Sequence, residues 1–185
     1  EDEIQFLKLK MVTTIEELNA AEQENIVKAL AKRKWRYPKI ESLLDDLTIR
    51  RLHKDMFNDV WTWAGQFRNV ELNLGVTPIQ ISVEVRNLVE DSKIWIANIS
   101  KENEVATMCK IHHRLVQIHP FHNGNGRFSR LYVDFLTENL GMQQFTWGGG
   151  SIQSNSRVRD KYISALREAD RGKIDKLIEF VYSDS

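Results

Sequence analysis

Residues 119–130 read HPFHNGNGRFSR, and this stretch decides which fold we expect. A helix ends at Pro120, a loop follows in which glycine and asparagine alternate, and a second helix begins near Arg127. Glycine lets the backbone adopt positive φ and approach a ligand closely, and a helix N-terminus offers unpaired N–H groups with a partial positive charge. The stretch therefore predicts an anion site between two helices.

The second helix has an unusual first turn. Acidic residues are usual there, but this chain places Arg127 and Arg130 against the helix dipole. That placement costs about 0.3–1 kcal/mol per charge, and a bound polyphosphate would reverse the sign by pairing with both guanidinium groups. The alternative is that both arginines lie on a solvated face, with Arg130 and Asp134 forming an i,i+4 ion pair.

Other side chains of the stretch also suit a nucleotide. Near neutral pH the imidazole of His119 would take a proton from an attacking hydroxyl; the alternative is a buried structural histidine on the face of Met108 and Val116. His112 lies on the same face and is expected to be such a core histidine. Asn123 offers a neutral oxygen to Mg²⁺, which commonly binds one protein ligand, phosphates and water. Phe121 is expected to anchor the loop in the core. We infer that the site handles the phosphates of a nucleotide.

The composition bounds the class of protein. The chain has 185 residues, and its 26 acidic and 26 basic residues balance, so nucleic acid is not expected as a main partner. The single cysteine, Cys109, excludes an internal disulfide and fits a reducing compartment. We see no membrane span or secretory signal and expect a soluble cytoplasmic protein without a membrane partner. Because the chain begins at Glu1 and not at methionine, a further N-terminal signal stays open.

The apolar periodicity predicts a mostly α fold in a single domain. Thr14 and Glu17 have the spacing of a capping box, and Ser82 is the expected cap of a later helix. Expected helices cover residues 15–30, 40–63 (one or two helices), 82–95, 102–118, 127–139, 155–169 and 173–182.

Residues 68–81 do not follow the helical period. They read RNVELNLGVTPIQI, in which Val70, Leu72 and Leu74 alternate with polar residues before a turn at Gly75 and Pro78. A short β-hairpin or an extended flap is therefore expected here.

The chain resembles the Fic family. Residues 119–130 match its signature, His-Pro-Phe-x-Asp/Asn-Gly-Asn-Gly-Arg-x-x-Arg, at each fixed position. Residues 63–68 resemble the segment leading into the family's flap, and residues 162–180 its closing helices. The LNAAEQENI segment and residues 145–148 are similar to the compact branch called mobile mystery protein B. The resemblance implies that residues 1–185 form a single Fic-type helical bundle with one short hairpin flap.

What the resemblance implies is transfer of AMP from ATP to a Tyr, Thr or Ser hydroxyl of a target protein, with release of pyrophosphate. His119 would be the base, Asn123 would help hold Mg²⁺, and the target backbone would add to the flap, residues 68–81, as a strand. The phosphates would be bound by the N–H groups of Gly124, Asn125 and Gly126, with Asn125 orienting the α-phosphate, and by Arg127 and Arg130 at the β- and γ-phosphates.

Family members are often inhibited by a glutamate that pairs with the last arginine of the motif, here Arg130. The usual form is Ser/Thr-x-x-x-Glu-Gly/Asn, and this chain has the ending at Glu24 but alanine at the first position. Glu24 lies opposite the apolar stripe of its helix, whereas Glu22 lies on it. We therefore hypothesise that Glu22, rather than Glu24, reaches Arg130 and that residues 1–35 are inhibitory. The alternative is that this first helix is solvated and has no regulatory role. Whether a separate antitoxin inhibits the site also stays open.

Other activities stay open at this point. They are transfer of UMP, phosphocholine or phosphate, removal of AMP from a target, modification of the chain itself, and nucleotide sensing without catalysis. The family's kinases carry a lysine near the second glycine, and the intact Gly126 argues against that variant.

Overall fold

A computed structural model describes residues 4–36, 38–149, 152 and 155–183, so both ends of the expected 1–185 domain lie outside the described residues. Helices dominate, which confirms the mostly α fold. The long helices are α1 (Ile15–Ala31), α4 (Asp46–Phe57), α5 (Ile81–Ala97), α6 (Glu104–Ile118), α7 (Asn125–Asn139) and α8 (Ser156–Asp170). The short ones are η1 (Ile4–Phe6), α2 (Arg33–Arg36), α3 (Ile40–Leu43), η2 (Pro78–Gln80) and α9 (Asp175–Val181).

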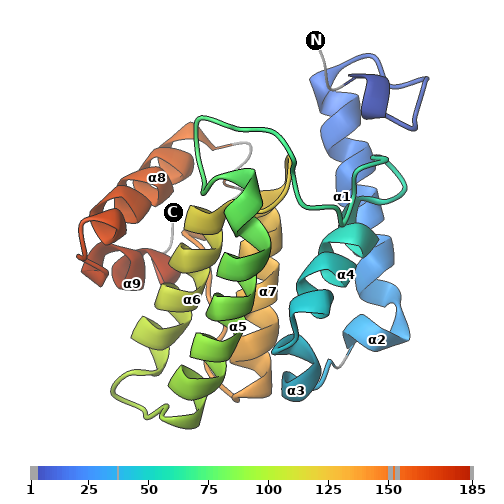
Figure 1. Cartoon of the computed structure of the whole chain (residues 1–185). Coiled ribbons are helices and arrows are strands. Elements are labelled where there is room, and N and C mark those ends of the chain that lie inside the picture. Colours follow the sequence, from blue (N-terminus) through green and yellow to red (C-terminus); the bar gives the residue numbers. More distant parts are fainter. Residues whose placement is uncertain (1–3, 37, 150–151, 153–154, 184–185) are drawn as a thin grey trace.

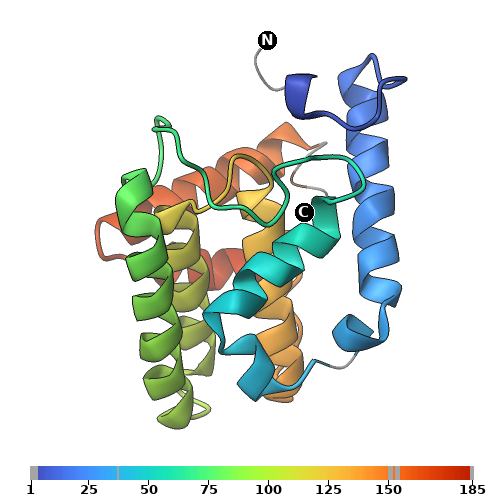
Figure 2. The same ribbon diagram turned by 45° about the vertical axis from the view of Figure 1, so that its right-hand side comes forward.

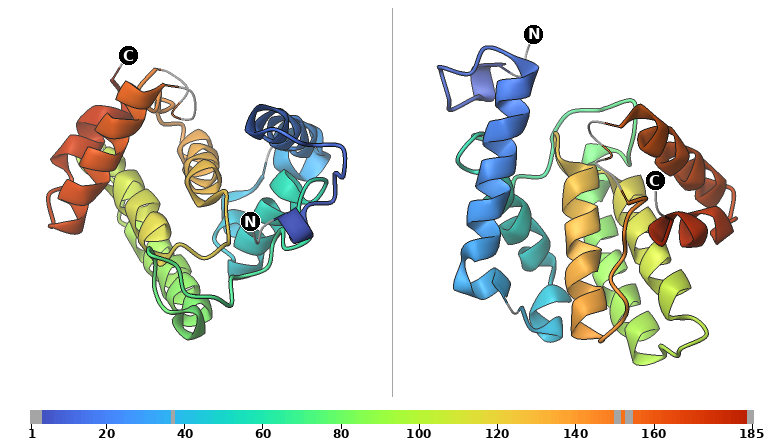
Figure 3. Two further views of the ribbon diagram at one scale, coloured as in Figure 1. Left: turned by 90° about the horizontal axis from the view of Figure 1, so that it is seen from above. Right: turned by 180° about the vertical axis from the view of Figure 1, so that it is seen from behind.

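Helix α7 lies at the centre of the bundle (Figure 1). It packs on α6 at one side and on α3 and α4 at the other, while α1 covers α4 and α5 packs on α6. The pair α8 and α9 covers the side remote from α1, with α9 against α6, as the view from behind shows (Figure 3). The flap, residues 68–81, and the loop between α6 and α7 meet at the same end of the bundle (Figure 2).

The ends of two helices follow from local chemistry. The capping box of α1 is confirmed: Thr14 Oγ1 accepts the Glu17 N–H at 3.2 Å, and the Glu17 carboxylate accepts the Thr14 N–H at 3.1 Å. The expected cap at Ser82 is wrong, because α5 already begins at Ile81. The 3-10 turn η2, with Pro78 in its first turn, leads directly into that helix.

No β-hairpin forms within residues 68–81, all of which the structure describes. The segment is an extended flap that ends in η2. The carbonyls of Val70 and Val76, on its two arms, both accept hydrogen bonds from the Arg68 guanidinium, with 2.9 Å between Nη1 and the Val70 oxygen. The guanidinium therefore occupies the place of strand pairing, which corrects the hairpin prediction.

Two histidines are fully buried. His112 was expected in the core, which is confirmed, and it bonds the Tyr162 hydroxyl through Nε2 at 2.9 Å. His53 accepts the Gly65 N–H at Nδ1 and bonds the Asn123 carbonyl through Nε2, both at 3.0 Å. Burial lowers the pKa of each imidazole to about 3. Both rings are therefore neutral in the folded protein.

These rings should make the protein less stable in mild acid. Below pH 6.5 His53 and His112 bind protons in the unfolded chain, whereas in the folded protein they stay neutral down to about pH 3. The contribution of these neutral rings to folding stability is therefore complete above pH 6.5 and declines as the pH falls. Between pH 6.5 and 5.5 each histidine should lower the free energy of unfolding by about 1 kcal/mol. Urea unfolding across that range measures the slope.

Asp134 acts in the opposite direction below pH 6, because burial raises its pKa to about 6. The comparison is therefore made between wild type and His112→Phe, which lacks one of the titrating rings but keeps Asp134. The variant should lose less stability with acid than wild type. Equal pH slopes for the two proteins would contradict a neutral, buried His112.

Candidate active site

The loop between α6 and α7 is held by a buried aromatic side chain and by hydrogen bonds within the loop. Phe121, expected in the core, is fully buried and stacks on His53 with ring centroids 3.6 Å apart. Asn125 accepts the Phe121 N–H at 2.9 Å and donates to the Phe121 carbonyl at 2.8 Å. Both ends of that amide are thus used within the loop. The side chain of Asn125 therefore closes the loop, and its backbone N–H lies in the first turn of α7. A role of Asn125 in orienting an α-phosphate stays a prediction.

The start of α7 is the place where the sequence predicts an anion site. Asn125 and Gly126 are the first two residues of the helix, so their N–H groups have no acceptor within it. The Gly124 N–H instead donates to the side-chain oxygen of Asn123 at 2.6 Å. Gly124 itself has φ 76°, and a Cβ there would lie 2.6 Å from the Phe57 ring. This glycine is required by both its conformation and its neighbour.

His119 stands at the mouth of a cavity of about 580 Å³, which the N-terminal residues of α7 also line. Its φ of 49° is left-handed, because α6 ends there and Pro120 cannot continue the helix. Burial and the nearby charge of Arg68 lower the pKa of His119, against a smaller opposite effect of the Val116 carbonyl. The imidazole is therefore neutral at pH 7, as a base must be.

The two arginines of the motif have different partners. Arg127 pairs with Glu22 at 2.6 Å, with side chains only 15% and 3% exposed, and its guanidinium lies over the Phe57 ring. Arg130 lies over the Tyr162 ring, 5.5 Å from its centroid. Neither residue lies on a solvated face. Glu22 is turned inward, but it binds Arg127 and not Arg130, which corrects the expected pairing.

The inward position of Glu22 has a second cause. Its other carboxylate oxygen accepts the Nε1–H of Trp61 at 2.6 Å. Glu24, by contrast, is exposed and forms an i,i+4 ion pair with Lys28 at 2.8 Å. Helix α1 thus presents one glutamate to the site and the other to solvent.

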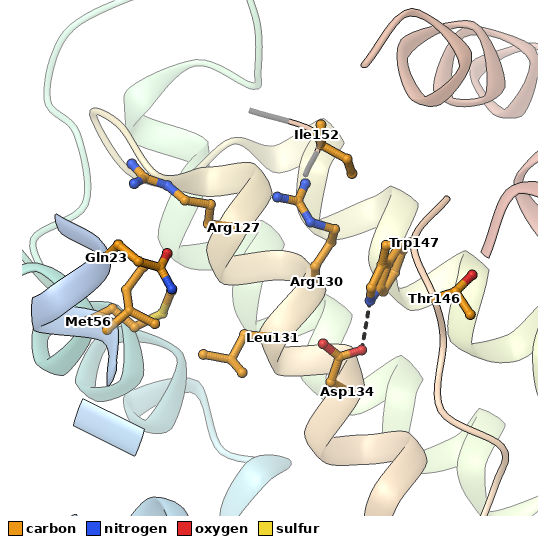
Figure 4. Close-up of a pocket in the computed structure, with 10 residues that line it drawn as sticks. Gln23, Met56, Arg127, Arg130, Leu131, Asp134, Thr146, Trp147 and Ile152 are labelled. Atoms are coloured by element: carbon orange, nitrogen blue, oxygen red, sulfur yellow. Dashed lines mark hydrogen bonds between the residues drawn. The ribbon is translucent and has the colours of Figure 1, made fainter. Parts of the chain in front are cut away.

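A second hollow of about 310 Å³ lies behind the arginines, between α1, α7 and the segment at Thr146 and Trp147. Figure 4 shows Arg127 and Arg130 leaving α7 in successive turns, with Arg130 reaching toward Ile152. Asp134 accepts the Nε1–H of Trp147 at 2.8 Å. This bond replaces the i,i+4 pair with Arg130 that was the alternative for these residues.

The residues present fit a magnesium ion only at the edge of the cavity. Asn123 is exposed and lines the cavity, and its amide oxygen has a second lone pair besides the one used by Gly124. Within the described part of the chain, no group of three His, Cys, Asp or Glu side chains could hold a metal. One neutral oxygen beside phosphates is the kind of site that Mg²⁺ accepts.

Sequence reasoning gave no role to three residues that build this site, namely Arg68, His53 and Trp61. His53 could have been found as a lone histidine on the apolar face of its helix, and Arg68 as a charge between aromatic and alternating apolar residues. Nothing in the sequence marks Trp61 as the partner of Glu22.

The contrast between the two glycines of the loop can be tested. Gly124→Ala should lower the free energy of unfolding by about 1–3 kcal/mol, because it forces a left-handed side chain against Phe57. Gly126→Ala should stay within about 0.5 kcal/mol of wild type, because its Cβ would meet only Arg130 Nη1, at 3.4 Å, on a helical backbone. Urea unfolding of both variants is the measurement. Equal losses would contradict the described loop.

The chain was compared with known proteins. The sequence model of the Fic/DOC family matches residues 43–137. The probable protein adenylyltransferase Fic of Escherichia coli is 27% identical over 107 residues, which cover 55% of this chain and 53% of that protein. The probable protein adenylyltransferase of Aquifex aeolicus is 39% identical over 92 residues, 49% of this chain and 25% of that one. The chain therefore spans about half, or less, of these relatives.

Solved structures share the fold over almost the whole chain. The BepC protein of Bartonella tribocorum, with bound AMPPNP, has a TM-score of 0.73 and 17% identity, covering 97% of this chain and 92% of that one. The Fic domain of a Bartonella quintana protein, with bound ADP, has a TM-score of 0.74 and 15% identity, covering 94% and 86%. With the signature at residues 119–130 and a family match across the centre of the bundle, the chain belongs to the Fic/DOC family.

Proposed function

We propose that the protein transfers AMP from ATP to a Tyr, Thr or Ser hydroxyl of a target protein and releases pyrophosphate. The observation that carries this proposal is a single cavity of about 580 Å³, lined by His119, by the start of α7 and by both arginines of the motif. The relatives from Escherichia coli and Aquifex aeolicus are named probable protein adenylyltransferases, and the related Bartonella domain binds AMPPNP.

The chemistry needs one proton transfer and one displacement. The target hydroxyl gives its proton to the neutral imidazole of His119 while its oxygen attacks the α-phosphorus of ATP. A new P–O bond forms, the bond between the α-phosphorus and the bridging oxygen breaks, and pyrophosphate leaves. Positioning and charge stabilisation supply most of the rate in such transfers.

In this proposal each phosphate of ATP has its own binding groups in the cavity. The N–H groups of Asn125 and Gly126 would bind the α-phosphate, and Arg127 and Arg130 the β- and γ-phosphates. Mg²⁺, when bound by the phosphates and Asn123, would neutralise part of their charge. We further propose that the target adds along the flap. Self-modification and a cytoplasmic location also stay predictions; within the described residues, no helix has both the length and the apolar character to cross a membrane.

Replacing His119 tests the reaction. His119→Ala should reduce labelling of protein by radioactive ATP and Mg²⁺ at least about 10²-fold, while ATP binding changes little, because the imidazole serves the hydroxyl and not the phosphates. His113→Ala is the matched control, since His113 pairs with Asp170 at the end of α8 and does not line the cavity of His119. Intact mass of the labelled protein identifies the group transferred.

Two results would contradict this proposal. If wild type and His119→Ala bind ATP equally and neither labels any protein, the chain is a nucleotide sensor. If the mass increase is that of UMP, phosphocholine or phosphate, the chain is a transferase of another group. Loss of AMP from an adenylylated protein would indicate the reverse activity.

We also propose that α1 restrains the site through Glu22. The carboxylate neutralises Arg127 from a buried position, so a polyphosphate must compete with it for the guanidinium. Residues 1–35 would then be inhibitory in the way that the family resemblance implies, acting through Arg127.

Glu22→Gln tests this restraint. The amide still accepts the Trp61 N–H but removes the negative charge, so affinity for ATP should rise about tenfold, the value of roughly one charge-assisted contact. Glu24→Gln is the matched control on the same helix and should bind like wild type, because Glu24 pairs with Lys28 in solvent. Titration calorimetry with ATP measures both. Equal affinity of the Glu22 and Glu24 variants would remove the proposal.

A further inference from the structure

Arg68 is one of the largest fully buried side chains of the protein, only 2% exposed. Its guanidinium donates to the carbonyls of His119 at 2.7 Å, of Val70 at 2.9 Å and of Val76. In the described part of the chain these backbone oxygens are its hydrogen-bond partners. Among the described residues no carboxylate is hydrogen-bonded to it, although the charge of Glu71 opposes the lowering of the Arg68 pKa by burial. A cation buried in this way is costly unless its donors are satisfied. The arrangement therefore calls for a role besides stability.

The most informative of these carbonyls belongs to His119. This residue has φ 49°, a left-handed conformation that costs a non-glycine residue about 1–2 kcal/mol. The Nε–H of Arg68 binds the carbonyl of that strained residue, and the Arg68 backbone N–H binds the next carbonyl, Pro120, at 2.9 Å. Both bonds fix the peptide planes that orient the imidazole.

The same guanidinium holds the flap against the base. Val76 N–H donates to the Ile118 carbonyl at 3.3 Å, so both arms of the flap touch the loop. At Gly75, with φ 97°, a Cβ would lie 2.7 Å from His119 Cβ and 2.5 Å from Arg68 Nη2. The flap backbone is thus in direct contact with the histidine side chain.

We propose that Arg68 is a positioning residue that sets the imidazole of His119 and the flap in one fixed relation, so that a hydroxyl carried by a segment on the flap arrives at the base. This inference rests on the proposed function for the role of His119 as base. The positive charge of Arg68 has a second effect, since it favours the neutral imidazole. The other charged or titratable groups lining the cavity are Arg127 and Arg130 of α7, Arg159 and Tyr162 of α8, and His122 of the loop.

The test measures the titration of His119 directly, by NMR of protein labelled with ¹³C and ¹⁵N in its histidines. In Arg68→Met the pKa of His119 should rise toward its ordinary value, because the charge is gone. In Arg68→Lys the charge remains but one ammonium cannot span both arms, so the signal of His119 should move while its pKa changes less. Binding of AMPPNP with Mg²⁺ should stay as in wild type.

Arg50→Met is the matched control, because Arg50 also binds a carbonyl, that of Gly65 at 3.1 Å, and lies over Phe67 without touching His119. It should leave the His119 titration unchanged. Where Arg68→Met does not fold, Gly75→Ala tests the same contact, since its Cβ must displace His119 or Arg68. An unmoved His119 signal in Arg68→Lys and Gly75→Ala, or an equal shift in Arg50→Met, overturns the proposal.

Labelling with ATP separates this inference from the proposed function. If wild type labels protein, Arg68→Lys should lose about 10²-fold in kcat with little change in KM for ATP, as expected when a base is displaced by about 1 Å. A His119 signal that shifts in the Arg68 variants while wild type labels nothing supports the positioning of His119 and counts against AMP transfer alone. A kcat equal to wild type in Arg68→Lys overturns the positioning role.

Discussion

The site depends on the hydrogen bonds that hold the backbone of residues 118–123 from beneath. This loop must face a ligand on one side and still keep a fixed shape. The carbonyls of His119 and Pro120 are bound by Arg68, that of Phe121 by Asn125 and that of Asn123 by His53. A buried backbone group without a partner is costly, so these donors specify one conformation. Little of the loop's own hydrogen bonding would then have to be rearranged on binding the proposed nucleotide.

The three arginines around the loop differ in the groups that they contact. Arg68 is satisfied by carbonyls and faces no ligand, Arg127 is neutralised by Glu22, and Arg130 lies over an aromatic ring. Arg127 and Arg130 are the two that lie in the first turns of α7, at its positive end, where an anion gains from both of them. The position of Glu22 is set by Trp61, which lies in the segment that leads into the flap. The proposed restraint on the phosphate site and the proposed platform for a target are therefore joined through one tryptophan.

The sequence allowed prediction of whatever a periodic pattern or a local rule determines. The capping box at Thr14, the buried His112 and the helices on either side of Pro120 follow from such rules, and the apolar phase of α1 identified Glu22 as the inward glutamate. Which arginine it meets could not be predicted, because that depends on how α1 crosses α7. The sequence left a hairpin and an extended flap open for residues 68–81, and the choice between them could not be predicted for a similar reason. Alternating apolar side chains fit a strand. Only the folded structure shows that the buried guanidinium of Arg68 donates to the carbonyls of Val70 and Val76, where strand pairing was possible.

The contact between Gly75 and His119 limits how the protein can acquire a new target. Side chains at Val70, Leu72 and Leu74 are exposed on the flap, whereas Gly75 meets the histidine with its backbone. If a target adds along the flap, as proposed, exchange of Val70, Leu72 or Leu74 alters what the flap recognises and leaves its anchorage intact. Any side chain at position 75 then alters recognition and the proposed catalysis together. Diversification among related proteins, or redesign in the laboratory, should therefore concentrate in residues 70–74 and leave position 75 unchanged.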